Sequence, residues 1–180
     1  SINKESNLVY SIMIVEDEYL VRQGIASLVN YEQFGMQVIA QAENGIEAWQ
    51  KFQENPADIL LTDINMPQMN GLELAKLVRD QVPTCHIVFL TGYDDFDYAR
   101  TAIKLGADDY LLKPFSKDDV EEMLAKVQTK LDKERKKARI QNLVDQGQRS
   151  ELEEAIHNRL ADSELSLKSL AFQLWFSPSY

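Results

Sequence analysis

Short apolar runs alternate with longer amphipathic segments through the first two thirds of the chain. In the amphipathic segments apolar residues recur three or four positions apart, as Ile46, Trp49 and Phe52 do, which is the spacing of one helix face. The apolar runs have the length of strands and cover residues 11–15, 37–42, 58–61, 86–90 and 109–112. Strands that are apolar on both faces and separated by helices are typical of a parallel sheet covered by helices on both sides. The pattern therefore predicts an α/β fold, a five-stranded, doubly wound, flavodoxin-like sheet with a C-terminal helical extension.

Polar residues that precede three of the amphipathic segments are predicted helix N-caps. Asn44, Asn70 and Ser116 each stand where a side-chain oxygen can accept a hydrogen bond from a free amide of the first turn. The last of these helices is predicted to be longer than the others, because its apolar stripe runs from Val120 to Leu131. The stripe fades into the charged stretch KERKKAR, so the helix is expected to leave the first domain as a linker, either as a single amphipathic helix or as half of a dimeric coiled coil.

Composition and periodicity divide the chain into four expected segments. Residues 1–10 form an N-terminal tail, either foreign to the natural protein or without fixed structure, and are assigned no function. Residues 11–130 form the α/β domain, and residues 131–149 form a helical linker. Residues 150–180 are expected to begin a second domain, with a short amphipathic helix of its own after Gly147.

The acidic charge of the chain is concentrated in its first two thirds. The net charge is -10; residues 1–125 hold 9 Lys and Arg against 21 Asp and Glu, whereas residues 126–180 hold 10 against 8. An acidic surface repels the phosphates of nucleic acids, so any DNA partner is expected to meet the other end of the chain. No apolar run approaches the roughly 20 residues of a membrane span, and no signal peptide precedes the first strand. These features predict a cytoplasmic protein without a membrane partner.

Polar residues follow four of the apolar runs at the point where each predicted strand ends. Glu16 and Asp17 follow the first run, Asp63 the third, Thr91 the fourth and Lys113 the fifth. Because the carboxyl ends of parallel strands share one edge of a sheet, these side chains are expected to converge. Three carboxylates repel one another unless a cation is present, and their oxygen-only set suits Mg²⁺. With an ammonium and a hydroxyl available for an anion, one carboxylate oxygen can act as a nucleophile, so phosphoryl transfer to an aspartate is predicted.

Four stretches of the sequence carry a resemblance to a known family. They are IVEDE, LLTDINMPQMNGLEL, IVFLTGYDD and LGADDYLLKPFSKDDV. In this order and at this spacing they resemble the receiver domain of bacterial two-component response regulators, from Ser11 to about Lys130. The resemblance implies a phosphoacceptor that takes part in its own phosphorylation and dephosphorylation but is not an enzyme. It also implies a sensor histidine kinase as the phosphoryl donor.

The resemblance implies a role for each matching position of the site. Asp63 accepts the phosphoryl group from a phosphohistidine of the kinase, and Lys113 bonds a phosphoryl oxygen. Mg²⁺ is held by the carboxylates of Glu16, Asp17 and Asp63 and by the backbone carbonyl of Asn65. Glu16 stands where the family more often has aspartate, which affects the metal geometry.

Other matching positions are implied to control the switch and its lifetime. Thr91 moves toward the phosphoryl group while the aromatic side chain of Tyr110 turns inward. Asn65 and Tyr93 tune how fast the acyl phosphate hydrolyses. The family also has a cis peptide where this chain has Lys113 followed by proline, and a phosphorylation-dependent homodimer is a further implication.

The last thirty residues resemble the start of an AraC-type DNA-binding domain. In the stretch LSLKSLAFQLWFSPSY, the first helix of a helix-turn-helix matches residues 167–174 and its turn matches residues 175–177. Ser177 then caps the recognition helix, whose start matches Pro178, Ser179 and Tyr180. The resemblance implies a transcription regulator whose full-length form binds promoter DNA, while this fragment can be phosphorylated but does not bind DNA specifically.

Three alternative functions fit parts of the same sequence. One is a receiver with a helical tail that does not bind DNA. A second is an Mg²⁺-dependent phosphatase of the haloacid dehalogenase type, which also forms an aspartyl phosphate but needs an acid where this chain has Asn65. The third is a flavin-binding domain of flavodoxin topology, which needs a loop rich in Ser, Thr and Gly where this chain has EDEYL.

Overall fold

A sheet of five parallel strands forms the centre of the first of two structural units, which meet after Lys130. The computed structural model describes residues 9–92, 96–104 and 106–160. The strands are β1 (Tyr10–Val15), β2 (Met36–Ala42), β3 (Ile59–Asp63), β4 (His86–Thr91) and β5 (Asp109–Leu112). Their order in the sheet is β2-β1-β3-β4-β5, which is the flavodoxin-like order, so the predicted fold class is confirmed.

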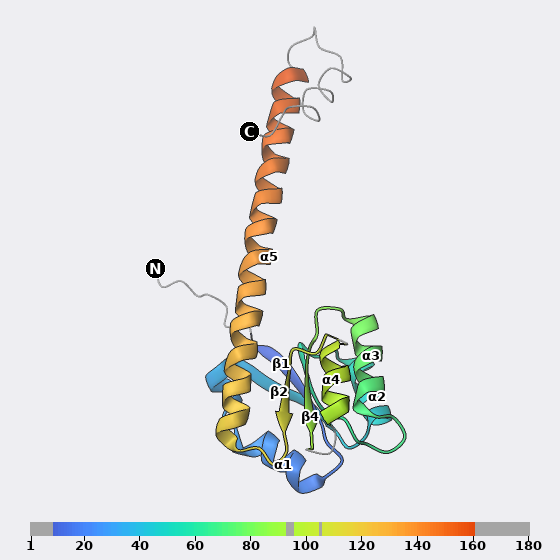
Figure 1. Ribbon diagram of the computed structural model, residues 1–180. Helices are drawn as coiled ribbons and strands as arrows, with labels where there is room; N and C mark the ends of the chain where they lie inside the picture. The colour runs from blue at the N-terminus through green and yellow to red at the C-terminus, as the bar shows by residue number, and fades with distance from the viewer. Residues whose placement is uncertain (1–8, 93–95, 105, 161–180) are drawn as a thin grey trace. The chain divides into compact units, whose positions relative to one another are not determined.

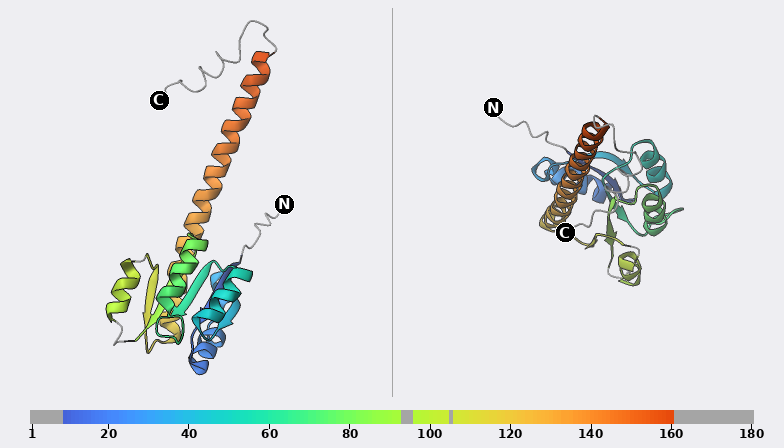
Figure 2. Two further views of the ribbon diagram at one scale, coloured as in Figure 1. Left: turned by 90° about the vertical axis from the view of Figure 1, so that its right-hand side faces the viewer. Right: turned by 90° about the horizontal axis from the view of Figure 1, so that it is seen from above.

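Helices cover both faces of this sheet. They are α1 (Tyr19–Leu28), α2 (Gly45–Glu54), α3 (Gly71–Gln81), α4 (Phe96–Lys104) and α5 (Lys117–Leu160), with a short 3₁₀ helix at Tyr31–Phe34. Helices α2, α3 and α4 lie on one face, and α1 and the first turns of α5 lie on the other (Figure 1). In the turned view, α2 and α3 stand in front of the strands (Figure 2). The 3₁₀ helix was not predicted, because four residues are too few to show a helical period.

The central strands are buried on both sides, which fixes the strand ends that carry the polar residues. Every residue of β3 and β4 is buried, as are Ile12, Ile14 and Val15 of β1. On one face they pack with apolar side chains of the covering helices, among them Phe52 and Leu74. Each large apolar side chain contributes about 1.5–3 kcal/mol when it leaves water. The sheet is therefore a rigid support for whatever its carboxyl edge holds.

The predicted N-caps are confirmed at three helices. The Asn44 side chain accepts a hydrogen bond from an amide in the first turn of α2 at 2.8 Å. Asn70 and Glu73 form a reciprocal capping box at the start of α3. Ser116 accepts a hydrogen bond from the amide of Asp119 at 3.1 Å, and the Asp119 carboxylate bonds back to the amide of Ser116 at 2.8 Å. These caps fix where the helices after β2, β3 and β5 begin.

The described part of the second unit, residues 131–160, is the continuation of α5. The sequence predicted a separate short helix after Gly147, whereas α5 runs through this glycine without a break. One interior glycine costs about 1 kcal/mol relative to alanine, which the good helix formers around it outweigh. The expected helix-turn-helix in residues 161–180 lies outside the described residues. Within the described ranges, no helix combines the length and the apolar character needed to cross a membrane.

Candidate functional site

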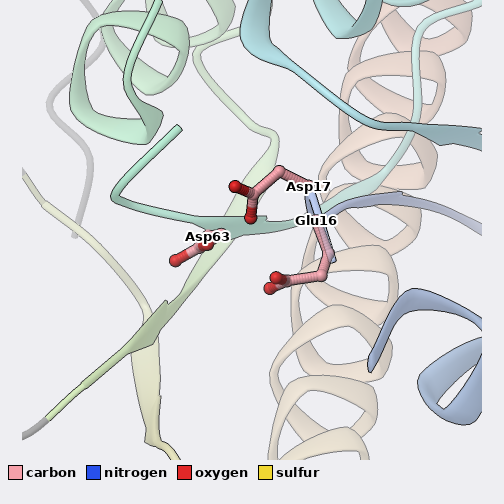
Figure 3. A group of neighbouring side chains, drawn as sticks. All are labelled: Glu16, Asp17 and Asp63. Carbon is pink, nitrogen blue, oxygen red and sulfur yellow. The ribbon is translucent and has the colours of Figure 1, made fainter. Parts of the chain in front are cut away.

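Three carboxylates lie together at the carboxyl edge of β1 and β3. Asp63 is the last residue of β3, and Glu16 and Asp17 follow the last residue of the neighbouring strand β1. One oxygen of each carboxylate lies within 4.8 Å of the others, and the side chains are directed toward a shared space (Figure 3). Glu16 is completely buried and Asp63 is 6% exposed, whereas Asp17 is exposed. The sheet thus brings together the three acidic residues that the sequence assigned to this edge.

Lys113 pairs with two of the three carboxylates. It follows β5, and its Nζ atom lies 3.0 Å from Glu16 Oε2 and 3.2 Å from Asp63 Oδ2. Its backbone N–H donates to the carbonyl of Thr91 at 2.7 Å, which joins the end of β5 to the end of β4. The peptide bond from Lys113 to Pro114 is cis, as the resemblance implied. An ammonium group that the sequence assigned to an incoming anion therefore already offsets part of the negative charge.

Burial and mutual repulsion raise the proton affinity of the carboxylates. Burial, followed by the charge of Asp63, raises the pKa of Glu16 to about 7 in spite of its pairing with Lys113. Burial also raises the pKa of Asp63, an effect that Lys113 opposes and Asp17 reinforces. Burial lowers the pKa of Lys113, but the two carboxylates outweigh it, so the pKa lies above its usual value. The site is short of positive charge, and a carboxylate cluster in this condition favours a bound cation.

One buried oxygen of the cluster lacks a hydrogen bond. Glu16 Oε2 accepts none from the described residues, although Lys113 Nζ is 3.0 Å away. The other oxygen, Oε1, accepts from Lys113 Nζ at 3.2 Å and from the amide of Glu18 at 3.3 Å. The ion pair with Lys113 leaves this buried oxygen without a well-directed hydrogen bond, so it can accept a further positive partner. Since carboxylate and carbonyl oxygens are the ligands that Mg²⁺ prefers, this donor set fits that ion.

A glycine allows the loop that follows Asp63 to close tightly. The Gly71 amide donates to the carbonyl of Ile64 at 2.8 Å. A Cβ atom at position 71 would lie 2.0 Å from the carbonyl oxygen of Asp63, closer than any side chain tolerates. Asn65, whose backbone carbonyl was expected to face the ion, lies in this loop and is exposed. The start of α3 thus supports the loop that carries the site.

The expected switch residues lie on β4, which is next to β3, and on β5, the edge strand beyond β4. Thr91 ends β4 and is fully buried, and its hydroxyl donates to the carbonyl of Gly92 at 3.3 Å. Tyr110 lies on β5, opposite Phe89 of β4, and is 39% exposed. Thr91 is therefore buried at the carboxyl edge of the sheet, whereas the Tyr110 side chain is exposed at the surface. The remaining expected residues, Tyr93, Ser177, Pro178, Ser179 and Tyr180, lie outside the described residues.

Two features beside the site were not predicted. Arg22 on α1 donates from Nη1 to the carbonyl of Glu16 at 2.5 Å, which ties α1 to the end of β1. An apolar groove of about 480 Å³ opens between α1 and the loop before α5, with Ile25, Leu28 and Phe115 in its wall. A lone arginine carries no sequence signal, and the walls of the groove come from segments far apart in the chain. Both features appear only once the fold brings these segments together.

The α/β unit matches a known domain family over almost its whole length. Residues 12–125 match the family model of the response regulator receiver domain. The chain belongs to this family. Its receiver domain is similar to that of AraT, a response regulator from Geobacillus stearothermophilus, with 42% identity and a TM-score of 0.68 over 71% of this chain and 98% of that one. A two-component transcriptional regulator AraC from Clostridium phytofermentans ISDg is 36% identical, with a TM-score of 0.63 over 68% of this chain and 96% of that one.

Curated relatives of the receiver domain are longer proteins. The uncharacterised transcriptional regulatory protein YesN of Bacillus subtilis is 36% identical over 123 residues, which are 66% of this chain and 33% of that protein. The transcriptional regulatory protein LnrK of the same organism is 38% identical over 118 residues, 66% of this chain and 53% of that protein. The chain therefore spans a third to a half of their length. The family match confirms the prediction of a response regulator receiver domain, and the acidic group of Glu16, Asp17 and Asp63 lies within the matched residues.

Proposed function

We propose that this receiver domain accepts a phosphoryl group on Asp63 from a phosphohistidine of a sensor kinase. The observation that carries the proposal is the setting of the Asp63 carboxylate. It ends β3, is 6% exposed, and lies beside Lys113 and two further acids. A carboxylate that is almost buried but open on one side can be reached by a donor and sheltered from bulk water afterwards.

The transfer is a displacement at phosphorus. A carboxylate oxygen of Asp63 supplies the electron pair of the new O–P bond. The P–N bond to the donor imidazole breaks, and the freed nitrogen keeps that electron pair and takes up a proton. Only the ionised carboxylate can attack, and the ammonium of Lys113 at 3.2 Å favours this form. The same ammonium can stabilise the charge on the transferred oxygens.

The carboxylates of Glu16, Asp17 and Asp63, with the backbone carbonyl of Asn65, are the groups that would hold Mg²⁺. The unbonded Oε2 of Glu16 and the raised pKa values of Glu16 and Asp63 support this assignment. When bound, the ion supplies positive charge for the phosphoryl oxygens. Glu16 must be ionised to act as a ligand, and its pKa of about 7 places that ionisation in the neutral range.

Thr91 and Tyr110 are assigned the response to phosphorylation. The Thr91 hydroxyl makes a long bond of 3.3 Å to a backbone carbonyl, so exchange for a charge-assisted bond to a phosphoryl oxygen is favourable. A shift of Thr91 would vacate space for Tyr110, which lies at the surface on the adjacent strand. A charge added at Asp63 would in this way shift the equilibrium between two arrangements of the Thr91 and Tyr110 side chains. Asn65 and Tyr93 are assigned the rate at which the acyl phosphate hydrolyses.

The kinase must bring its phosphohistidine to the open side of Asp63, so its contact surface borders the site. The apolar groove between α1 and the loop before α5 meets this requirement, because Lys113 belongs both to its wall and to the site. Leu28 in its wall is 66% exposed, so this apolar surface is open to a partner. We therefore assign this groove to the kinase, with an apolar helix face as the matching partner surface.

The output of the protein is inferred from its relatives and from the C-terminal sequence. YesN and LnrK are named as transcriptional regulatory proteins, and the Clostridium AraC as a two-component transcriptional regulator. By analogy, residues 11–130 receive the signal, and residues 150–180 begin an AraC-type DNA-binding domain. Residues 131–149 are the helical linker between these two domains. Promoter DNA is then a partner of the longer protein, which dimerises on phosphorylation and turns over no external substrate.

Phosphorylation in vitro tests the central part of this proposal. Incubation with Mg²⁺ and a small acyl phosphate donor should add one phosphoryl mass to the chain and none to Asp63→Asn. Asp80→Asn is a matched control, since Asp80 is exposed on α3 and should be labelled like the wild type. Equal labelling of Asp63→Asn and the wild type would contradict the assignment. Repeated hydrolysis of a phosphomonoester would favour the aspartyl-phosphate phosphatase instead, although Asn65 stands where that class needs its second acid.

A further inference from the structure

The part of α5 beyond Lys130 carries a patterned face that the receiver function does not use. Its members are all exposed, and apart from one adjacent pair in the middle they follow one another at spacings of three or four, which keeps them on one side of the helix. They are Lys133, Lys136, Ile140, Leu143, Val144, Gly147, Glu151 and Glu154. We call these eight residues the α5 face. Along the helix the face is basic at first, apolar in the middle and acidic at the end.

The middle of the α5 face is apolar and uncovered by the described residues. Ile140, Leu143 and Val144 are 53%, 59% and 47% exposed. Gly147 lies on the same face, and a Cβ atom there would meet nothing within 4 Å. An interior glycine costs a helix about 1 kcal/mol relative to alanine, and no close packing by the described residues explains it. The glycine leaves room for a side chain of another molecule to approach the helix backbone.

The two ends of the α5 face carry opposite charge. Residues 131–139 hold five Lys and Arg against two Asp and Glu, and residues 145–154 hold one against four. A second copy of the helix in parallel register would set lysines against lysines and glutamates against glutamates, which is unfavourable. A second copy in the opposite direction would set each basic end against an acidic end. The charge pattern therefore selects one orientation of a helix pair.

We propose that this part of α5 associates with the same helix of a second copy of the chain in antiparallel orientation. A twofold axis between positions 143 and 144 makes the α5 face complementary to itself in charge and in side-chain size. The facing pairs are Lys133 with Glu154, Lys136 with Glu151, Ile140 with Gly147, and Leu143 with Val144. The pairing needs no change at Asp63, so it is independent of the proposed phosphorylation.

The size of the α5 face makes this association weak and dependent on salt. The face extends over about 32 Å of helix, but its apolar part covers only the middle turns. Three apolar side chains and a glycine from each copy bury much less surface than the roughly 1,200–2,000 Å² of a stable interface. The four ion pairs of the dimer add about 0.2–1 kcal/mol each and are screened by salt. We expect self-association at high protein concentration that weakens as ionic strength rises.

Sedimentation equilibrium of the whole chain at low salt tests the charge pairing. Lys133→Glu with Lys136→Glu should lower the association constant at least about tenfold, because four attractions become repulsions. Adding Glu151→Lys and Glu154→Lys to the same chain should restore association, since every antiparallel pair is then complementary again. In a parallel dimer the fourfold variant would still place like charges together, so failure of this rescue would overturn the proposal.

A matched variant separates the α5 face from general charge effects. Arg135→Glu with Arg149→Glu makes the same change in net charge at positions outside the face, and it should associate like the wild type. Equal loss of association in both double variants would overturn the specific pairing. A wild-type chain that stays monomeric at low salt and high concentration would overturn the proposal altogether.

Disulfide trapping reports the orientation directly. Lys136→Cys and Glu151→Cys chains of different mass, mixed and mildly oxidised, should form the mixed disulfide and little of either homodimer. Homodimers of each variant in place of the mixed species would indicate a parallel pair and contradict the proposal. The chain's own Cys85 is buried, and burial raises the pKa of its thiol to about 12, so the wild type should remain uncrosslinked and serves as the control.

Discussion

Replacing Glu16 by glutamine removes the charge that the site accommodates least well. Glu16 is completely buried, and burial together with Asp63 raises its pKa from 4.5 to about 7. Between these values the folded protein keeps a proton that the unfolded chain has lost, so the free energy of unfolding falls as pH rises through this range. The difference between 4.5 and about 7 corresponds to about 3 kcal/mol. The raised pKa of Asp63 acts in the same direction.

Urea unfolding without Mg²⁺, at about pH 5 and about pH 8, measures this loss. The wild type should lose about 3 kcal/mol between the two conditions, and Glu16→Gln should lose no more than about 1 kcal/mol. Glu47 and Asp108 have lowered pKa values, so their contributions are lost only at lower pH and leave this window unaffected. Glu54→Gln, a change at an exposed position of α2, should keep the wild-type dependence. Mg²⁺ at the higher pH should stabilise the wild type more than Glu16→Gln. The same pH dependence in both proteins would refute the reasoning from burial.

Three further substitutions probe the supports of the site. Gly71→Ala should lower the free energy of unfolding in urea by at least about 2 kcal/mol, because its Cβ would collide with the backbone. Gly24→Ala is the control and should be neutral or stabilising, because its Cβ would come no closer than 3.8 Å to a side chain. Equal losses of stability in the two variants would show that the collision at position 71 is relieved. Asn70→Ala should lower the free energy of unfolding by about 1 kcal/mol, because the α3 cap is lost, and Asn70→Ser should stay close to the wild type. An unchanged unfolding midpoint of Asn70→Ala would contradict a contribution of the cap to stability. Arg22→Ala should weaken Mg²⁺ binding by roughly fivefold in calorimetry, because the hydrogen bond that holds the Glu16 carbonyl is lost. Arg22→Lys should restore part of the lost affinity. Identical affinities of Arg22→Ala and the wild type would mean that this hydrogen bond does not position the ligands.

Strands and caps were predictable because local patterns specify them. Each strand was placed within two residues of its observed ends, since an apolar run bounded by polar residues coincides with a strand buried on both faces. The convergence of Glu16, Asp17, Asp63 and Lys113 followed from topology alone, because parallel strands deliver their carboxyl ends to one edge. No side-chain geometry was needed for that step.

Contacts that form only in the completed fold could not be predicted from the sequence. The pairing of Lys113 with both buried acids depends on how far β5 lies from β1 and β3. The bond from Arg22 to the Glu16 carbonyl and the apolar groove depend on how α1 packs against the sheet. The change of composition after Gly147 predicts a new segment there, yet the good helix formers around this glycine carry α5 through it. Each of these features is decided by tertiary or cooperative effects that a local pattern does not contain.

The identity of the phosphoacceptor is tested most directly by locating the phosphoryl group in the chain. After labelling with an acyl phosphate donor and Mg²⁺, borohydride reduces an aspartyl phosphate to homoserine, which peptide mass spectrometry can assign to one position. We expect homoserine at position 63 of the labelled protein and at no position of the unlabelled protein. Homoserine at Asp17 or at any other aspartate, with Asp63 unchanged, would contradict the proposed function.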